Sequence, residues 1–549
     1  MTVDTNLQHE PSLPALLDRR RVLDCCWIFL AWAAPAALLH PFQNTPFVDD
    51  WVYAWPVQRL LAHGDLRLLD YSGSLNLVQV LWGALFCLPF GFSFTALRLS
   101  TWLCGAVCLW STYLLLQELR VSRRDSLIAT AALGAYPIFF VLSYTFMTDV
   151  PFLAAMIGSL LAFVRALRRQ HNGWLAAAVS CAALSVGIRV IGLVLPVAMM
   201  MTLLVHAGPW GRRRARFLWP LAVFAFFGLL AWWHHGHIER IADLTWIENA
   251  PQRRLRDLRL YGWRLLPSMT VCTATFLAGA IGLALLPLVA AWTRGRRRLW
   301  SVLVFAALGL LVLAMPKLHQ SYLPPLAPHA TWALEELGAT EPLVPGFEAF
   351  SQPRWFVWSI STAAFASFSL LLGGLLRRAR REHAFFWWVI LIQFLLFSLL
   401  WLFYDRYALS LLPLFTALLL SADELRRPRL AISLLGVMAL DSFLGVRDHL
   451  NYNRALWQAV DEMGRLAPIS QIDGGYVVNG WLQYAHPENA PRDAAGAVAV
   501  PMMNVRSRLP YRIANRPLQG YHVIRSIPYR RWLGRSGSIW LLEQDRPSR

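Results

Sequence analysis

The chain has 549 residues, of which 57% are hydrophobic and 15% are charged, and its formal net charge is +19. A mean hydropathy of +0.43, with apolar stretches long enough to cross a bilayer, excludes an ordinary soluble protein and predicts an all-α, polytopic membrane protein. The positive charge does not indicate nucleic acid binding, because the arginines cluster in short loops between apolar stretches, as the positive-inside rule expects.

The first part of the chain predicts a cytoplasmic tail, a membrane span and a long outer loop. These are residues 1–22, 23–42 and 43–93, respectively. The first apolar segment lacks a small-residue cleavage site, so we expect it to remain as an anchor. A second apolar stretch, at about 75–90, is short and is closed by a proline, and we interpret it as an interfacial or re-entrant helix. This choice keeps every later arginine cluster on the cytoplasmic side.

The remaining apolar segments bring the total to about thirteen predicted spans. They lie at about 94–117, 127–145, 151–168, 173–189, 191–207, 217–234, 269–292, 299–315, 355–376, 384–404, 406–421 and 429–446. The cytoplasmic loops between them are short and basic, whereas two further outer segments, 235–268 and 316–354, are long. The transmembrane domain is therefore expected over residues 23–446.

Hydropathy falls after Arg447, which predicts a small extracytoplasmic α/β domain over residues 447–549. A helix is expected at about 452–465, and short strands at 521–527 and 538–542. Between them, two glycine-containing segments predict turns, with acceptor binding as the alternative. These segments are Asp473-Gly474-Gly475 and Asn479-Gly480-Trp481.

Two acidic sites lie at the ends of predicted spans, where carboxylates are costly to keep and are therefore functional candidates. Asp49 and Asp50 follow the first span, and Asp149 follows a later one. The predicted topology puts all three on the outer face. There, a carboxylate can take a proton from an acceptor hydroxyl while an activated sugar is attacked. The alternative interpretation is helix capping, because each acidic site precedes a predicted helix.

Four short motifs, by their order and spacing, resemble the GT-C membrane glycosyltransferases, in particular the bacterial branch related to protein mannosyltransferases and the lipid A aminoarabinose transferase. They are Phe47-Val48-Asp49-Asp50 with Tyr53, Tyr144-Thr145-Phe146-Met147-Thr148-Asp149-Val150-Pro151-Phe152, Gly187-Ile188-Arg189-Val190-Ile191-Gly192, and Asp405-Arg406-Tyr407-Ala408-Leu409 with Leu412-Pro413. The resemblance covers residues 23–446 and implies a GT-C-like helical domain. The chain departs from it at Ser72-Gly73-Ser74-Leu75-Asn76-Leu77, where many relatives carry a His/Lys-Pro-Pro-Leu element.

The resemblance implies a hexosyl- or pentosyltransferase of the cell envelope, a multi-pass protein of the bacterial inner membrane. It would move a sugar from a polyprenyl-phosphate donor to a glycan, lipid or protein acceptor on the extracytoplasmic side, with inversion by direct displacement. An acid of the first loop is implied as the general base. Asp49 occupies that position, Asp50 is the second candidate, and Asp149 carries over as the acid of the second loop.

The same resemblance implies a site for the donor phosphate. Arg189 and Arg406, with Tyr407, would bind it, since the planar guanidinium pairs well with phosphate oxygens. The alternative for both arginines is snorkelling at a helix end. Asn76 and Gln79 are expected to take over part of the basic contact that is missing from the departing segment.

A divalent cation, Mg²⁺ or Mn²⁺, is the cofactor that the acidic pattern suggests. Asp49 and Asp149 are its candidate oxygen ligands, and the alternative is that they orient the acceptor without a metal. A weaker set of candidate ligands is His234, His235 and His237, next to Glu239, for which we prefer interfacial histidines. All seven cysteines lie in apolar segments, which indicates neither a disulfide framework nor a zinc site.

Two other classes of protein compete with the enzyme. A transporter or lipid-linked-glycan flippase would place charged residues in the middle of the membrane at broken, often repeated helices. A non-catalytic scaffold would present only the C-terminal domain and would leave the acidic loops without a role. The acids lie at the outer ends of the spans and no repeated halves are visible, so the sequence favours the glycosyltransferase.

Overall fold

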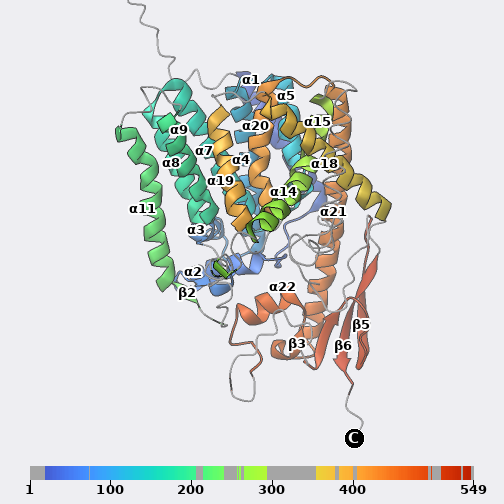
Figure 1. The fold of residues 1–549 in the computed structure, drawn as a ribbon. Helices are drawn as coiled ribbons and strands as arrows, with labels where there is room; N and C mark the ends of the chain where they lie inside the picture. Colours follow the sequence, from blue (N-terminus) through green and yellow to red (C-terminus); the bar gives the residue numbers. More distant parts are fainter. Residues whose placement is uncertain are drawn as a thin grey trace, which may run out of the picture.

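The structure is a computed structural model whose described part is a bundle of helices with a small β-sheet at one end (Figure 1). The described residues are 19–72, 75–205, 214–239, 241, 256, 259–260, 265–292, 354–377, 383–399, 405–492, 496, 509–532 and 536–545. The predicted span at 299–315, nearly all of the predicted outer segment 316–354 and most of the predicted outer segment 235–268 lie outside them.

The helices follow the apolar segments of the sequence closely. Those of the N-terminal half are α1 (Arg19–Leu39), α2 (Asp50–His63), α3 (Leu77–Cys87), α4 (Phe94–Glu118), α5 (Arg123–Ala135), α6 (Pro137–Leu142), α7 (Asp149–Arg169), α8 (Asn172–Ile188), α9 (Val194–Val205) and α11 (Arg214–Gly236). Those of the C-terminal half are α14 (Leu265–Ala284), α15 (Leu286–Trp292), α18 (Arg354–Leu376), α19 (Ala384–Leu399), α20 (Leu412–Ala422), α21 (Pro428–Gly464) and α22 (Tyr476–Asn479).

Six of the described helices have the length and hydropathy of a membrane span, namely α1, α4, α7, α11, α18 and α21. The bent pair α14 and α15 makes a seventh if it is counted as one span, and α3, α8, α9, α19 and α20 are shorter apolar helices. The total of about thirteen spans stays a prediction, because part of the chain lies outside the described residues.

Two predicted spans are broken, so their prediction as continuous helices is wrong. The span at 127–145 divides into α5 and α6, because Tyr136 is extended, with ψ of 123°, and precedes Pro137. Proline disfavours a helical conformation of the preceding residue. The span at 269–292 divides into α14 and α15, which bend by 71° at a break just before Leu286 and Pro287.

The two ends of the bundle carry different groups of charged residues. At one end, Arg123 donates to Asp24 at 2.5 and 2.8 Å, and Arg165 lies 2.9 Å from Glu118. The first loop, with α2 and α3, lies at the opposite end, together with α22 and the sheet (Figure 1). The arginine-rich loops and the predicted acidic site are therefore separated by about the 37 Å length of α4.

The C-terminal segment is tied to the bundle by a single long helix. Helix α21 has 37 residues and continues through the predicted domain boundary at 447. Its outer half packs against a four-stranded sheet of order β3-β4-β6-β5 and contributes to a separate buried cluster with Ile513, Ile527 and Leu541. The strands are β3 (Ile472–Asp473), β4 (Tyr511–Ala514), β5 (Tyr521–Tyr529) and β6 (Gly537–Gln544).

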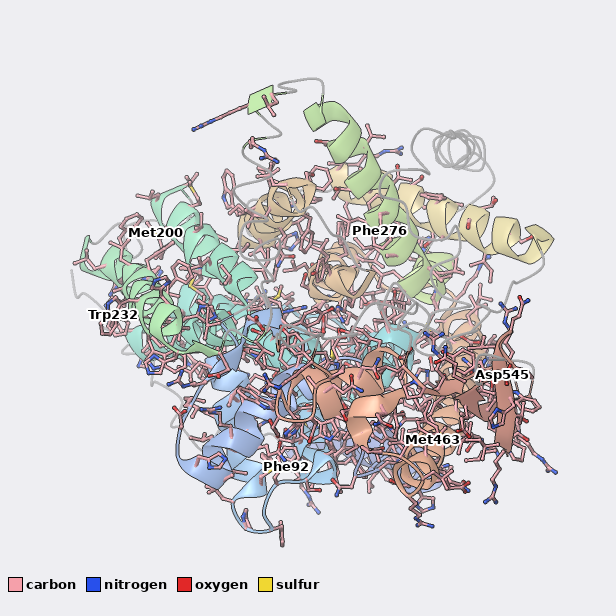
Figure 2. All side chains as sticks on the ribbon, turned by 90° about the horizontal axis from the view of Figure 1, so that it is seen from below. Phe92, Met200, Trp232, Phe276, Met463 and Asp545 are labelled. Atoms are coloured by element: carbon pink, nitrogen blue, oxygen red, sulfur yellow. The ribbon has the colours of Figure 1, made fainter. Side chains whose placement is uncertain are left out.

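Both strands predicted in this region are confirmed as β5 and β6, which pair antiparallel. A second, two-stranded parallel sheet joins β1 (Leu68–Leu69) of the first loop to β2 (Ile238–Glu239), which follows α11. Figure 2, seen from the end that carries the sheet, has Phe92 on the side of the first loop and Met463 and Asp545 on the side of the C-terminal segment.

Candidate active site

Asp49 lies at the start of α2 but does not cap it. Its side chain makes no capping hydrogen bond, so the capping interpretation is wrong for this carboxylate. Instead, Oδ1 accepts a hydrogen bond of 2.6 Å from the Tyr476 hydroxyl, and Oδ2 lies 3.6 Å from Nη1 of Arg406. The side chain is 16% exposed, which leaves the carboxylate accessible from outside the protein.

Asp149, the first residue of α7, lies against the same arginine. Its Oδ1 accepts a hydrogen bond of 2.6 Å from Arg189 and lies 4.0 Å from Nε of Arg406. The second oxygen, Oδ2, is buried and has no hydrogen-bond partner among the described residues. Arg406 thus links two carboxylates that come from separate loops, as the predicted sidedness requires.

The predicted arginines and tyrosine are grouped around these acids. Arg189 is an extended residue that directly follows α8, and its guanidinium lies 5.3 Å from the centre of the Tyr407 ring. Arg406 and Tyr407 belong to a 3-10 turn, Asp405–Leu411, that leads into α20. Tyr53 of α2 is buried nearby, and burial raises the pKa of its phenol to about 12, so the phenol remains protonated. We name Asp49, Asp149, Arg189, Arg406 and Tyr407 the acid–arginine cluster.

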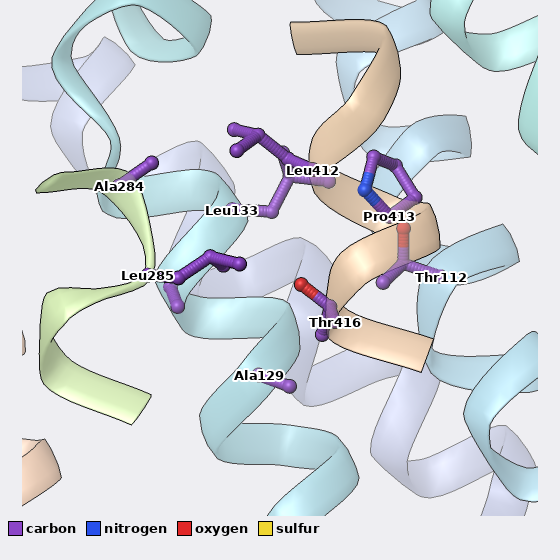
Figure 3. Close-up of a pocket in the computed structure, with 9 residues that line it drawn as sticks. Thr112, Ala129, Leu133, Ala284, Leu285, Leu412, Pro413 and Thr416 are labelled. Carbon is purple, nitrogen blue, oxygen red and sulfur yellow. The ribbon is translucent and has the colours of Figure 1, made fainter. Parts of the chain in front are cut away.

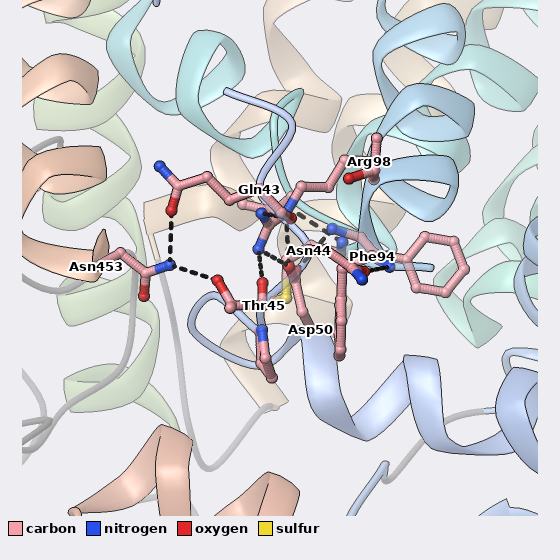
Figure 4. Close-up of polar contacts among 12 residues, drawn as sticks. Gln43, Asn44, Thr45, Asp50, Phe94, Arg98 and Asn453 are labelled. Atoms are coloured by element: carbon pink, nitrogen blue, oxygen red, sulfur yellow. Dashed lines mark hydrogen bonds and ion pairs between the residues drawn. The ribbon is translucent and has the colours of Figure 1, made fainter. Parts of the chain in front are cut away.

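Asp50 is directed away from this cluster. It is fully buried, accepts hydrogen bonds from Arg98 at 3.0 and 3.2 Å, and accepts the Phe146 backbone N–H at 2.7 Å. Arg98 is also fully buried, and the pair joins the first loop to α4 (Figure 4). The hydrogen bond from Phe146 adds the second loop. This placement favours a structural ion pair, and the role of Asp50 as a second candidate base stays a prediction.

The first loop is held in place by further contacts that the sequence did not indicate. Arg98 donates to the Gln43 and Thr45 carbonyls at 2.6 and 2.5 Å, and Asn453 of α21 donates to the side chains of both residues (Figure 4). Val48, just before Asp49, has a φ of +54°. A β-branched residue rarely adopts this conformation, and such strain persists only where the surroundings impose it.

Tyr476 is the residue of this site that the sequence reasoning missed. It lies 427 residues from Asp49 in the chain, in a segment without resemblance to a motif. The turn predicted at 473–475 is confirmed: Asp473 accepts from Gly475 and Asn479, and Asn479 accepts from Gly474. The turn predicted at 479–481 is wrong, because Asn479 ends α22 and Gly480–Tyr484 continue as a π-helix. The neighbouring turn motif was the signal available, but nothing in it indicated the contact with Asp49.

Asn76 and Gln79 lie on α3, at the same end of the bundle (Figure 1). Both are fully buried, and their side-chain oxygens and nitrogens have no hydrogen-bond partner within the described part of the chain. Helix α3 packs against α8, where Val78 abuts Gly187, two residues before Arg189. Their donor-binding role stays a prediction.

The cluster is a poor fit for a divalent cation shared by Asp49 and Asp149. The Arg406 guanidinium lies within 4.0 Å of both carboxylates, and a second positive charge there would be repelled. Across the described residues, no three His, Cys, Asp or Glu side chains are grouped as metal ligands. The ring of His237 stacks on Trp233, and Glu239 lies 3.3 Å from Arg67. The interpretation of these histidines as interfacial stays a prediction.

An apolar pocket elsewhere in the bundle is a weaker candidate. It is lined by residues of α4, α5, α14 and α20 and by Leu285 between α14 and α15, including Leu133, Leu285 and Pro413 (Figure 3). Its only polar side chains are the hydroxyls of Thr112 and Thr416. Without a charged or titratable group, this lining offers no general base and no partner for a phosphate.

Residues 78–234 match the family described as dolichyl-phosphate-mannose-protein mannosyltransferase. No curated protein sequence matches the chain. Among solved structures, it is similar to ArnT from Cupriavidus metallidurans bound to undecaprenyl phosphate, with 13% identity, a TM-score of 0.40, and coverage of 96% of this chain and 99% of that chain.

Two further solved structures are similar over smaller parts of this chain and of their own chains. The archaeal oligosaccharyltransferase AglB from Archaeoglobus fulgidus, in complex with an inhibitory peptide and a dolichol-phosphate, has 15% identity and a TM-score of 0.41, over 82% of this chain and 58% of that chain. The S. cerevisiae Pmt1-Pmt2 complex bound to the sugar donor has 14% identity and a TM-score of 0.32, over 39% of this chain. The match spans 34% of the yeast chain.

The family match covers residues 78–234, which is less than half of the chain. Over these residues it confirms the resemblance to membrane glycosyltransferases of the protein-mannosyltransferase type that the motifs predicted.

Proposed function

We propose that the protein transfers a sugar from a polyprenyl-phosphate donor to a hydroxyl of a glycan, lipid or protein acceptor on the outer face of the membrane. The observation that carries the proposal is the acid–arginine cluster, in which Asp49 and Asp149 share Arg406 at the end of the bundle opposite the arginine-rich loops. The solved ArnT and AglB structures contain undecaprenyl phosphate and a dolichol-phosphate, respectively, and the donor class is extended to this chain by analogy.

Asp49 is the proposed general base. Its carboxylate is partly exposed and retains lone pairs beyond those used by Tyr476 and Arg406. In the reaction, the acceptor oxygen forms a bond with the anomeric carbon, the bond from that carbon to the phosphate oxygen breaks, and the acceptor proton goes to Asp49. The products are the glycosylated acceptor and polyprenyl phosphate.

Arg189 and Arg406 are the proposed partners of the donor phosphate. A guanidinium carries five N–H donors in a fixed fork, and Arg189 uses one of them for Asp149. The negative charge that develops on the leaving phosphate would be stabilised by these two cations. Asp149, in turn, holds Arg189 at 2.6 Å, so we assign it the role of orienting the arginines.

The test is transfer by the purified full-length protein in lipid nanodiscs. It is incubated with a panel of radiolabelled polyprenyl-phosphate sugars and a membrane extract that supplies acceptors. We expect label to move from one donor into one acceptor fraction, and the Asp49→Asn variant to show no such movement. The proposal fails if folded wild-type protein transfers sugar from none of the donors.

A further inference from the structure

The contact between the C-terminal segment and the candidate base carries an inference beyond the reaction itself. The Tyr476 hydroxyl donates a hydrogen bond of 2.6 Å to Oδ1 of Asp49 and lies 3.1 Å from the Tyr71 hydroxyl. Burial, and then the charge of Asp49, raise the pKa of Tyr476 well above its ordinary value. The phenol therefore remains a hydrogen-bond donor throughout the range in which a carboxylate titrates.

The position of Tyr476 is fixed from both sides. On its own segment, the preceding Gly475 has a φ of +80° and closes the turn that Asp473 and Asn479 hold. On the side of the first loop, the Tyr476 ring lies 6.0 Å from the Trp51 ring, and Gly480 packs so closely on Trp51 that a Cβ there would overlap it. The phenol thus has little freedom to leave Asp49.

We propose that Tyr476 is a positioning residue for Asp49, by which the C-terminal segment orients the general base. The hydrogen bond of 2.6 Å to Oδ1 limits rotation of the carboxylate, whose other oxygen, Oδ2, lies 3.6 Å from Arg406. The inference rests on the proposed function of Asp49. It gives the C-terminal segment a part in catalysis without contact with the reacting atoms.

Other charged and titratable groups surround the contact. Arg406 lies 3.6 Å from Asp49, and the charge of Asp49 acts on Asp50 and Tyr53. Tyr71 contacts Tyr476, Asp149 contacts Arg189 and Arg406, and Tyr407 contacts Arg189. Replacing Tyr476 by phenylalanine removes the phenolic hydroxyl and keeps the ring beside Trp51 and Tyr71. A change in kcat of this variant is then due to the lost hydrogen bond.

The experiment compares Tyr476→Phe with the matched variant Tyr484→Phe in the full-length protein. Tyr484 also packs on Trp51 and Tyr71, but its hydroxyl donates to Asp70 rather than Asp49. For Tyr476→Phe, we expect kcat to fall about tenfold at unchanged donor KM. Tyr484→Phe should leave both kcat and the donor KM unchanged.

A thermal melt of each variant confirms that it is folded. The proposal is overturned if Tyr476→Phe keeps the wild-type kcat, or if Tyr484→Phe lowers kcat to the same extent. A double-mutant cycle of Tyr476→Phe and Asp49→Asn, read by melting temperature, tests the contact without any substrate. Non-additive shifts support the contact, and additive shifts overturn it. If the wild-type protein shows no transfer, the proposed function fails. Non-additive melting shifts in the cycle would then show that the contact between Tyr476 and Asp49 only stabilises the fold.

Discussion

Asp49 and Asp50 are neighbours in the chain, yet their carboxylates occupy opposite kinds of environment. Asp50 is sealed from solvent, and its two oxygens accept three hydrogen bonds from Arg98 and Phe146. Asp49 is partly exposed and lies at the edge of a cluster in which one oxygen of Asp149 has no hydrogen-bond partner among the described residues.

The difference shows how one acidic motif supplies both a scaffold and a reactive group. A buried ion pair gains little stability over apolar packing, since desolvation offsets its attraction, but removing one partner is strongly destabilising. The Asp50–Arg98 pair therefore serves to define the geometry of the loop. Asp49, which this geometry presents to the cluster, keeps the exposure and spare lone pairs that proton transfer requires.

The largest expected effect separates these two roles. Asp49→Asn should lower the rate of sugar transfer by about 10²–10⁴-fold, the usual contribution of a general base, with little change in the melting temperature. Initial rates with the labelled donor measure it. Asp65→Asn is the matched control, because Asp65 lies in the same loop and pairs with Arg59 and Arg67 away from the cluster. Equal losses in both variants would contradict the assignment of Asp49.

Asp50→Asn should act on stability instead. It leaves the fully buried Arg98 without a counter-charge, at a cost of about 3–5 kcal/mol in the free energy of unfolding. Denaturant unfolding in micelles measures this cost. The comparison variant is Asp125→Asn, whose partner Arg124 is 52% exposed and can be hydrated once unpaired, so its loss should be smaller. If Asp50→Asn melts like the wild type but loses transfer, Asp50 is catalytic after all.

Arg189→Gln tests the phosphate side of the cluster. Hydrogen bonds to charged groups contribute about 1.5–3 kcal/mol, so the KM for the donor should rise roughly 10–100-fold, and Arg189→Lys should recover part of it. Arg165→Gln is the control at the opposite end of the bundle, where Arg165 pairs with Glu118 at similar exposure. A donor KM that is unchanged in Arg189→Gln would remove this residue from the donor site.

The smallest expected effect concerns metal ions. Because Arg406 already lies between Asp49 and Asp149, transfer should persist at its full rate after treatment with a chelator. The measurement is the initial rate before and after dialysis against EDTA, with Mg²⁺ and Mn²⁺ added back separately. Loss of activity that either ion restores would show that a cation, and not the guanidinium, links the two loops.

Much of the architecture was predictable, because membrane helices are set by local composition. Apolar length identified α1, α4, α7 and α11 within a few residues. The interpretation of 75–90 as a short helix agrees with α3 and its 11 residues. The breaks at Tyr136 and before Leu286 were not predicted, although Pro137 and Pro287 lie beside them. Hydropathy averaged over the length of a membrane span does not detect a local change in the direction of the helix.

By itself, the sequence determined which residue types stand at the ends of the spans and which family motifs they form, since these depend on local hydropathy and on short patterns. Only the tertiary structure decided that Asp49 meets Arg406 and Tyr476 while Asp50 meets Arg98. The partners come from segments far apart in the chain, and two adjacent aspartates are indistinguishable by composition. Burial and the position of the nearest arginine, which are properties of packing, assign one to the scaffold and the other to the site.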